Sequence, residues 1–260
     1  VDGRHTLIHL DIEGVIDDLL YNEKHTMRAR MSNGVCLTCT RRAGNYFEAT
    51  VQLRSSARRL SEQEFQTLRK TLDQVMADMP EDPMFFITSE GPVTGGYDVV
   101  LGSKALARAW GRSLIAAHGG IVTTTTSVVG RKDGLDVTRL TLLYRKPGYN
   151  LGDVIRWRGS LWRPASWTGE GVILEKIERR ERTGASWRDL ENSNVVSRKK
   201  DFIKIDAISE DSSAAEFLDP NTWKMVAVRL PFEHEAGRDL LLARIDDEWI
   251  CLPRLGMDGE

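Results

Sequence analysis

The sequence predicts an α+β fold, with an α+β sandwich domain over residues 46–147 and an all-β module over residues 148–260. Two observations lead to this prediction. Up to residue 146 the hydrophobic pattern reads strand, helix, strand, strand, helix, strand, strand, which suits a sheet with two helices on one face. Beyond it, short strand-like runs and tight glycine turns replace the helical patterns, as they do in small β-barrels.

The α+β domain opens with a strand and a capped helix. Residues 46–54 alternate strictly between polar and apolar side chains, as a half-buried strand does. Ser61 and Glu64 then form a capping box, and Pro80 stops the helical pattern that follows. The remaining elements are strands at 84–91 and 97–103, a helix at 104–118 that Ser103 can cap, and a hairpin of strands 121–129 and 135–145.

The all-β module has weaker boundaries. Its first hairpin is expected in GDVIRWRGSLW, and a polar stretch over 184–200 predicts a loop. Strand-like pieces return at 201–208, 223–230, 239–245 and 248–252.

Composition narrows the class of protein. The apolar fraction is 41% and the charged fraction 28%, as in globular proteins. No stretch approaches 18 consecutive apolar residues, so we expect no membrane partner, and three cysteines in 260 residues fit a reducing, cytoplasmic location. We find no P-loop, dinucleotide-binding, zinc-protease or serine-hydrolase motif, so we expect neither an enzyme nor a small-molecule substrate.

The charge is unevenly distributed although the formal net charge is only −2. Residues 26–60 hold seven arginines and one acidic residue, Glu48, whereas residues 206–260 hold thirteen Asp or Glu against five Lys or Arg. A basic front and an acidic back predict a protein that presents one surface to a polyanion, although an ordinary solvated surface remains the alternative.

The candidate metal ligands are Cys36 and Cys39. A Cys-x-x-Cys pair supplies two of the four ligands of a structural zinc site, so it predicts half a site in a longer parent protein. His5 and His9 could complete it, but two histidines four apart on an apolar strand are more often surface or core residues. We expect no cofactor in this chain.

The candidate RNA-binding residues are six arginines and one lysine. The guanidinium group suits phosphate and base stacking. Arginines 58 and 59 precede a capped helix, and Arg131 with Lys132 occupies a hairpin tip. The alternation of Arg156, Arg158 and Arg163 with Trp157 and Trp162 fits either a binding surface or a barrel core with solvated arginines. The full set that we select is Arg41, Arg42, Arg54, Arg58, Arg59, Arg131 and Lys132.

Three motifs resemble one known family. CLTCTRRAGNYFEATVQLR (36–54), YDVVLGSKALARAWGRSLIAAHGG (97–120) and VGRKDGLDVTRLTLLYRKPGYNLGDVIRWRG (129–159) are similar to the Nmd-three family of large-ribosomal-subunit export adaptors and assembly factors. The resemblance covers about residues 30–165. It implies a zinc-binding region, of which residues 1–45 are a remnant that lacks most of the cysteines. It also implies a domain like ribosomal protein L22e over 46–147 and a module like the hypusine-bearing translation factor, with SH3-like or OB-like barrels, over 148–260.

The resemblance also implies a function. We expect a non-enzymatic assembly factor that binds the joining face of the large ribosomal subunit through ribosomal RNA and ribosomal proteins. No leucine-rich exportin-binding tail is evident before CLPRLGMDGE, which resembles the shorter archaeal members. The alternative is a protein–protein adaptor that works through the acidic C-terminal module, with RNA contact incidental.

Overall fold

The structure is a computed structural model that describes residues 5–30, 34–56, 58–191, 193–232 and 234–256. Internal contacts divide the chain into two units, residues 1–45 and residues 46–260. No helix within the described ranges has both the length and the apolar composition that a membrane crossing requires.

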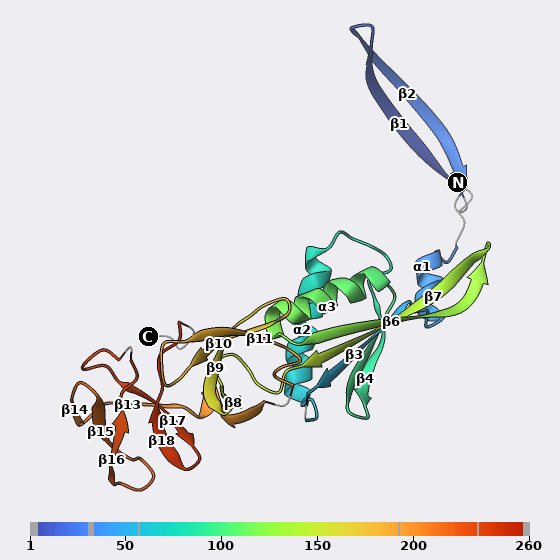
Figure 1. Ribbon diagram of the computed structural model, residues 1–260. Helices are drawn as coiled ribbons and strands as arrows, with labels where there is room; N and C mark the ends of the chain where they lie inside the picture. Colours follow the sequence, from blue (N-terminus) through green and yellow to red (C-terminus); the bar gives the residue numbers. More distant parts are fainter. Residues whose placement is uncertain (1–4, 31–33, 57, 192, 233, 257–260) are drawn as a thin grey trace. The chain divides into compact units, whose positions relative to one another are not determined.

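The first unit is a long antiparallel hairpin followed by a short helix (Figure 1). Strands β1 (His5–Ile16) and β2 (Leu19–Arg30) pair along their whole length, and Asp17 and Asp18 form the turn at φ of 49° and 65°. Two positive φ values match the twist of a two-residue hairpin turn. The helix is α1 (Leu37–Ala43), and the sulfur of Cys36 caps its first turn.

The second unit begins with a five-stranded sheet in the order β4-β5-β3-β7-β6. Strands β3 and β7 run parallel, and the other neighbours are antiparallel. The predicted order of strands and helices over 46–146 is confirmed. The bounds are β3 (Ala49–Ser55), α2 (Glu62–Asp78), β4 (Ile87–Val93), β5 (Gly96–Leu101), α3 (Lys104–His118), β6 (Ile121–Lys132) and β7 (Leu135–Lys146).

Both helices cover one face of this sheet (Figure 1). Alternate residues of β3 are buried, from Ala49 through Val51 and Leu53, and they pack with the apolar faces of α2 and α3. Trp110 is fully buried there, and its indole N–H donates to Thr71 Oγ1 at 2.8 Å. The alternate residues of β3 that face the other way are half-buried.

The β6–β7 hairpin extends beyond the sheet (Figure 1). Because β3 begins opposite Leu140, residues 127–139 of the hairpin pair only with each other. We call these residues the arm. The arm contains a bulge between Val128 and Gly130, and its Asp133–Gly134 turn has φ of 52° and 77°. The predicted hairpin is confirmed, but its connection was expected over 130–134, whereas β6 continues to Lys132 and leaves a turn of two residues.

The rest of the second unit is all-β, as predicted. One sheet has the order β11-β10-β9-β8-β12, and two three-stranded sheets have the orders β13-β17-β18 and β14-β15-β16. The expected loop over 184–200 is wrong in part, because residues 184–186 belong to β11 and residues 194–197 form a strand that pairs with β8. The bounds are β8 (Val154–Trp157), β9 (Ser160–Trp167), β10 (Gly171–Lys176), β11 (Arg182–Ser186), β12 (Asn194–Ser197), β13 (Ile203–Ile205), β14 (Ser209–Glu210), β15 (Ala214–Leu218), β16 (Met225–Arg229), β17 (Leu240–Ile245) and β18 (Glu248–Cys251), with a 3-10 turn at Lys199–Asp201.

Candidate nucleic-acid interface

Arg58 is held at the start of α2 by an acidic partner. Its guanidinium donates to both carboxylate oxygens of Glu64, at 2.7 and 2.5 Å, and to the carbonyl of Arg59 at 3.1 Å. Glu64 is also the acidic half of the predicted capping box, which the structure confirms with Ser61 as N-cap. The hydrogen bonds from Arg58 lower the pKa of Glu64 to about 2, although partial burial opposes the shift. This guanidinium thus fixes the helix start.

Arg54 is also used inside the domain. Its Nη1 forms an ion pair with Asp98 Oδ1 at 2.9 Å and donates to the carbonyls of Leu53 and Tyr97 at 2.9 and 3.0 Å. The side chain is only 20% exposed. Arg54 thus links β3 to β5, and a phosphate would have to displace or share these contacts.

Lys146 adds a buried cation behind this end of the sheet. Its Nζ lies 3.4 Å from Glu64 Oε1 and donates to Asn150 Oδ1 at 2.9 Å, and the residue is 6% exposed. Burial lowers the pKa of Lys146, and the nearby Glu64 carboxylate opposes that shift. Arg59, by contrast, is exposed. It is therefore the better placed of these groups to meet a polyanion.

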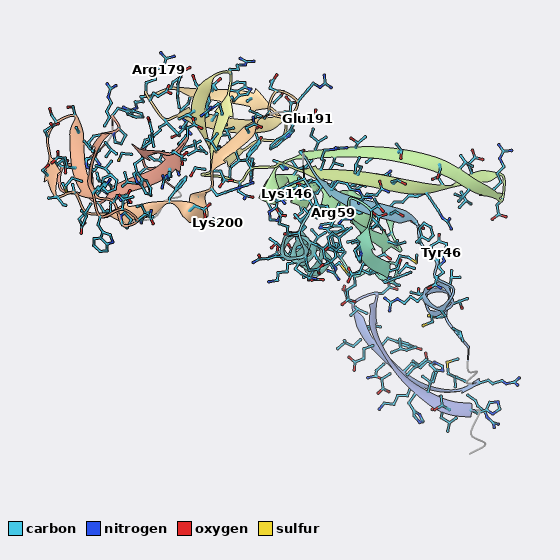
Figure 2. The ribbon with its side chains drawn as sticks, turned by 90° about the horizontal axis from the view of Figure 1, so that it is seen from below. Tyr46, Arg59, Lys146, Arg179, Glu191 and Lys200 are labelled. Atoms are coloured by element: carbon cyan, nitrogen blue, oxygen red, sulfur yellow. The ribbon has the colours of Figure 1, made fainter. Side chains whose placement is uncertain are left out.

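The structure separates the candidate arginines of the second unit into two places. Figure 2 shows Arg59 and Lys146 at one end of the sheet, with the arm at the other. Strand register agrees, because Arg145 lies opposite Arg54 while Asp136, opposite Arg131, lies nine residues earlier on β7. At roughly 3.3 Å per residue the two places are about 30 Å apart. One phosphate group cannot bridge them, but an RNA surface can.

The arm carries an exposed, weakly paired cation. Arg131 Nε lies 2.8 Å from Asp136 Oδ1, with side chains 77% and 46% exposed. An ion pair this exposed contributes little to stability, so an RNA phosphate can compete for the guanidinium. Lys132 ends β6, and its side chain lies outside the described residues. Four large apolar side chains of the arm are also exposed, namely Val128, Val129, Leu135 and Val137.

Arg139 is a candidate that sequence reasoning missed. Its guanidinium lies 3.9 Å from the ring centroid of Phe47, in a cation–π contact at the base of the arm. Arginine and an aromatic ring stacked together are typical of surfaces that accept nucleobases. The signal could not be found in the sequence, because 92 positions separate the two residues.

The arginines and tryptophans that alternate over β8 and β9 divide between core and surface. Arg163 is fully buried and donates to the carbonyls of Gly152 at 3.1 Å and Pro253 at 2.6 Å, so it is a core residue. Trp162 is also buried. Arg156 is exposed and forms an ion pair with Asp246, while Arg158 lies over the ring of Trp157 at 4.3 Å.

The first unit contains the remaining candidates. Arg41 and Arg42 lie in the last turn of α1, where the helix dipole stabilises positive charges. The sulfurs of Cys36 and Cys39 lie 3.1 Å apart, and both cysteines are exposed and free. Within the described part of the chain, no three His, Cys, Asp or Glu side chains gather as a metal site would need. The described residues therefore do not fit a complete structural zinc site.

The histidines that could have completed the zinc site lie on β1. His9 Nδ1 is 3.0 Å from Thr26 Oγ1 across the hairpin. The ring of His9 thus has a partner within its own hairpin.

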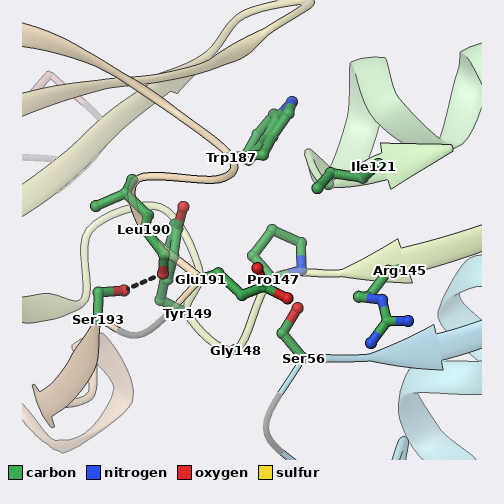
Figure 3. Close-up of a pocket in the computed structure, with 11 residues that line it drawn as sticks. Ser56, Ile121, Arg145, Pro147, Gly148, Tyr149, Trp187, Leu190, Glu191 and Ser193 are labelled. Carbon is green, nitrogen blue, oxygen red and sulfur yellow. Dashed lines mark hydrogen bonds between the residues drawn. The ribbon is translucent and has the colours of Figure 1, made fainter.

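A small pocket lies between the sheet and the all-β part of the second unit (Figure 3). It is lined by Ser56, by Arg145 near the end of β7, by Pro147 just after that strand, and by Trp187, Leu190, Glu191 and Ser193. Ser193 Oγ donates to the carbonyl of Leu190 at 2.8 Å and closes one side. The lining combines one cation, Arg145, and one carboxylate, Glu191, with serine hydroxyls and apolar rings.

The chain is similar to a known protein family. The family model described as NMD3, second domain, matches residues 46–145. A search of curated proteins found no match. The matched range coincides with the sheet and the two helices that cover it.

Proposed function

The chain belongs to the NMD3 family through this second domain, and on that premise we propose that it is a non-enzymatic ribosome assembly factor. The match over 46–145 is the observation that carries the proposal. The factor binds the large ribosomal subunit at its joining face and contacts ribosomal RNA and ribosomal proteins. Its effect is occlusion: while it is bound, an immature subunit cannot pair with the small subunit.

We choose the proposed RNA contacts by the solvent exposure of each cation and by the ion pairs that it already forms. Arg59 and Arg131 are exposed at opposite ends of the sheet, so each can reach a separate stretch of the RNA backbone. Arg139, stacked on Phe47 at the base of the arm, can accept a base or a phosphate. In the first unit, Arg41 and Arg42 add a third basic place, and Lys132 extends the tip of the arm.

Arg54 and Arg58 have a different role in this proposal. Both guanidinium groups already bind carboxylates of the same domain. They fix β3 and α2 and thereby position the exposed cations. Cys36 and Cys39 are half of a zinc site that a longer parent would complete, and the factor itself needs no cofactor.

Co-sedimentation tests the proposal. The chain is mixed with purified large subunits, small subunits and joined ribosomes from an archaeal source over a salt series. We expect binding to free large subunits alone, with affinity that falls as salt rises because phosphate contacts release counterions. Equal binding to all three particles, or to none, would contradict the proposed function.

The acidic C-terminal module supports a second candidate function. Thirteen acidic residues against five basic ones over 206–260 make this part unsuited to phosphate and suited to a basic protein. If apolar contacts carry most of the affinity of such an adaptor, binding would persist at high salt, because salt screens the charge attraction but not the apolar contacts. The same salt series therefore separates the two candidates.

A further inference from the structure

The loop between β15 and β16 presents an exposed tryptophan from a rigid base. Asp219 N–H donates to the carbonyl of Lys224, and Trp223 N–H donates to the carbonyl of Asp219, both at 2.9 Å. The buried Asp219 carboxylate also accepts from the Asn221 N–H at 2.9 Å and the Thr222 hydroxyl at 3.0 Å. Asp219 thus takes part in four hydrogen bonds, and these fix the loop.

Trp223 occupies a backbone position that is unfavourable for it. Its φ is 55°, in the left-handed region that glycine, asparagine and aspartate tolerate best. Six of the eight described non-glycine residues with positive φ are Asp or Asn, and Trp223 is the only aromatic one among them. Backbone strain of this kind persists where the surrounding structure enforces it, and it marks candidate functional positions.

The side chain of Trp223 buries little surface in the fold to offset that strain. It is 75% exposed, whereas the other six tryptophans of the chain are buried or half-buried. Met225, two residues later at the start of β16, is 50% exposed and enlarges the apolar surface. A large, rigidly presented aromatic side chain is the type of residue that dominates binding energy at protein interfaces.

The net charge of residues 206–260 favours a protein over RNA as the partner. The module that carries the loop is acidic, so a phosphate backbone would be repelled from it. A basic protein surface would be attracted. We propose that Trp223 is an anchor that inserts into an apolar pocket, rimmed by basic side chains, on a protein of the large ribosomal subunit. This inference depends on the proposed function for the choice of particle.

Photocrosslinking tests the class of partner. The photoreactive residue p-benzoylphenylalanine replaces Trp223 in the full chain, which is bound to purified large subunits and irradiated. The control places the same residue at Val93, which is 39% exposed on β4. We expect a protease-sensitive, RNase-resistant adduct from position 223. An adduct with ribosomal RNA, or no adduct while the chain is bound, would overturn the proposal.

Affinity measurements test the anchor itself. Trp223→Gly removes the side chain and relieves the positive φ, so we expect unchanged or higher thermal stability together with at least about 10-fold weaker binding to large subunits. Asp247→Gly is the control, because it relieves a φ of 69° in the same module without removing an aromatic ring. Its affinity should stay within about 2-fold of the starting chain.

The outcomes separate this inference from the proposed function. If the unmodified chain binds large subunits and Trp223→Gly binds equally well, the anchor is overturned and the proposed function stands. If the unmodified chain does not bind large subunits, the proposed function fails and this partner fails with it. If Trp223→Gly weakens binding to protein-free ribosomal RNA as much as to subunits, the partner is RNA and the proposal is overturned.

Discussion

Arg58 and Glu64 form a two-pronged ion pair across the N-terminus of α2, with N–O distances of 2.7 and 2.5 Å. The neighbouring Arg59 is exposed. Two consecutive arginines therefore have different roles, one structural and one available to a partner. Substitution can separate these roles.

Arg58→Ala should destabilise the domain, while Arg59→Ala should not. Removing Arg58 leaves the Glu64 carboxylate without its strongest donor, and partial solvent exposure limits the expected cost to about 1 kcal/mol. Arg59→Ala should change the free energy of unfolding by less than about 0.5 kcal/mol. Urea unfolding followed by circular dichroism measures both. Equal effects of the two substitutions would contradict the assigned roles.

The same pair predicts a dependence of stability on pH. The pKa of Glu64 falls from the ordinary 4.5 to about 2 in the folded state. The unfolded chain therefore binds more protons between these values, so the stabilisation is present above pH 4.5 and is lost as pH falls toward 2. After allowance for solvent screening, the loss is about 1–2 kcal/mol.

Glu64→Gln isolates this contribution from the other carboxylates. The free energy of unfolding of the variant should fall less steeply than that of the unmodified chain between pH 5 and pH 2. The substitution also removes one partner of Lys146, whose Nζ still donates to Asn150 Oδ1. Parallel curves for the two proteins would show that the Arg58 pair does not lower this pKa.

The strands and helices of residues 46–146 could be predicted from the local sequence, because each is marked by its own hydrophobic period, helix cap or turn residues. The capping box at Ser61 and Glu64 is an example. The β12 strand was missed because NVVS is short and its partner β8 lies some forty residues earlier. Pairing of distant segments leaves no local pattern.

The candidate site was less predictable, because the role of an arginine depends on what the fold brings beside it. The register of β3 and β5 places Arg54 beside Asp98, and the carbonyls around Arg163 come from Gly152 and Pro253. Nothing within a few residues of either arginine indicates this. The sequence could select a residue type that suits RNA, and only the fold shows which of those groups are already occupied.

Salt dependence should distinguish the exposed arginines from the occupied ones. Arg131→Ala and Arg59→Ala should each weaken binding to large subunits and reduce the slope of log K against log salt by about one. Arg54→Ala should lower the stability of the domain, because the substitution leaves the partly buried Asp98 without its ion-pair partner. After correction for the folded fraction, the salt slope of this variant should match that of the unmodified chain. An unchanged slope for Arg131→Ala would remove the arm from the proposed interface.

Gly119→Ala should disrupt the packing of the sheet domain against the all-β part. A Cβ at this position would lie 2.7 Å from Trp187 Cη2 and 2.8 Å from Trp167 Cε3, and the backbone has a φ of 67°. Overpacking and backbone strain together should cost about 2–3 kcal/mol in urea unfolding. Gly130→Ala in the arm is the control, because its Cβ would meet no atom within 4 Å. A small effect at Gly119 would mean that the two rings move apart without cost.

The three cysteines should react with iodoacetamide in a fixed order. The backbone N–H of Cys39 donates to the Cys36 sulfur at 3.3 Å, and this contact, with the thiol of Cys39, lowers the pKa of Cys36. The pKa of Cys39 rises because of its side-chain hydrogen bond with Cys36 and the nearby Cys36 charge. Burial raises the pKa of Cys251 to about 11. Since the thiolate is the nucleophile, we expect Cys36 to be alkylated first, Cys39 second and Cys251 last at pH 7.5.

Alkylation of a Cys39→Ser variant, and alkylation in the presence of zinc, test whether Cys36 and Cys39 are only half of a zinc site. In Cys39→Ser, the Cys36 sulfur keeps the backbone donor but loses the thiol, so its alkylation should slow. Equimolar zinc should protect neither cysteine, because two thiolates leave half of the coordination sphere to water and the described residues supply no third ligand nearby. Full protection of both sulfurs at equimolar zinc would show that the chain completes a metal site, and the assignment of residues 1–45 as a remnant would then be wrong.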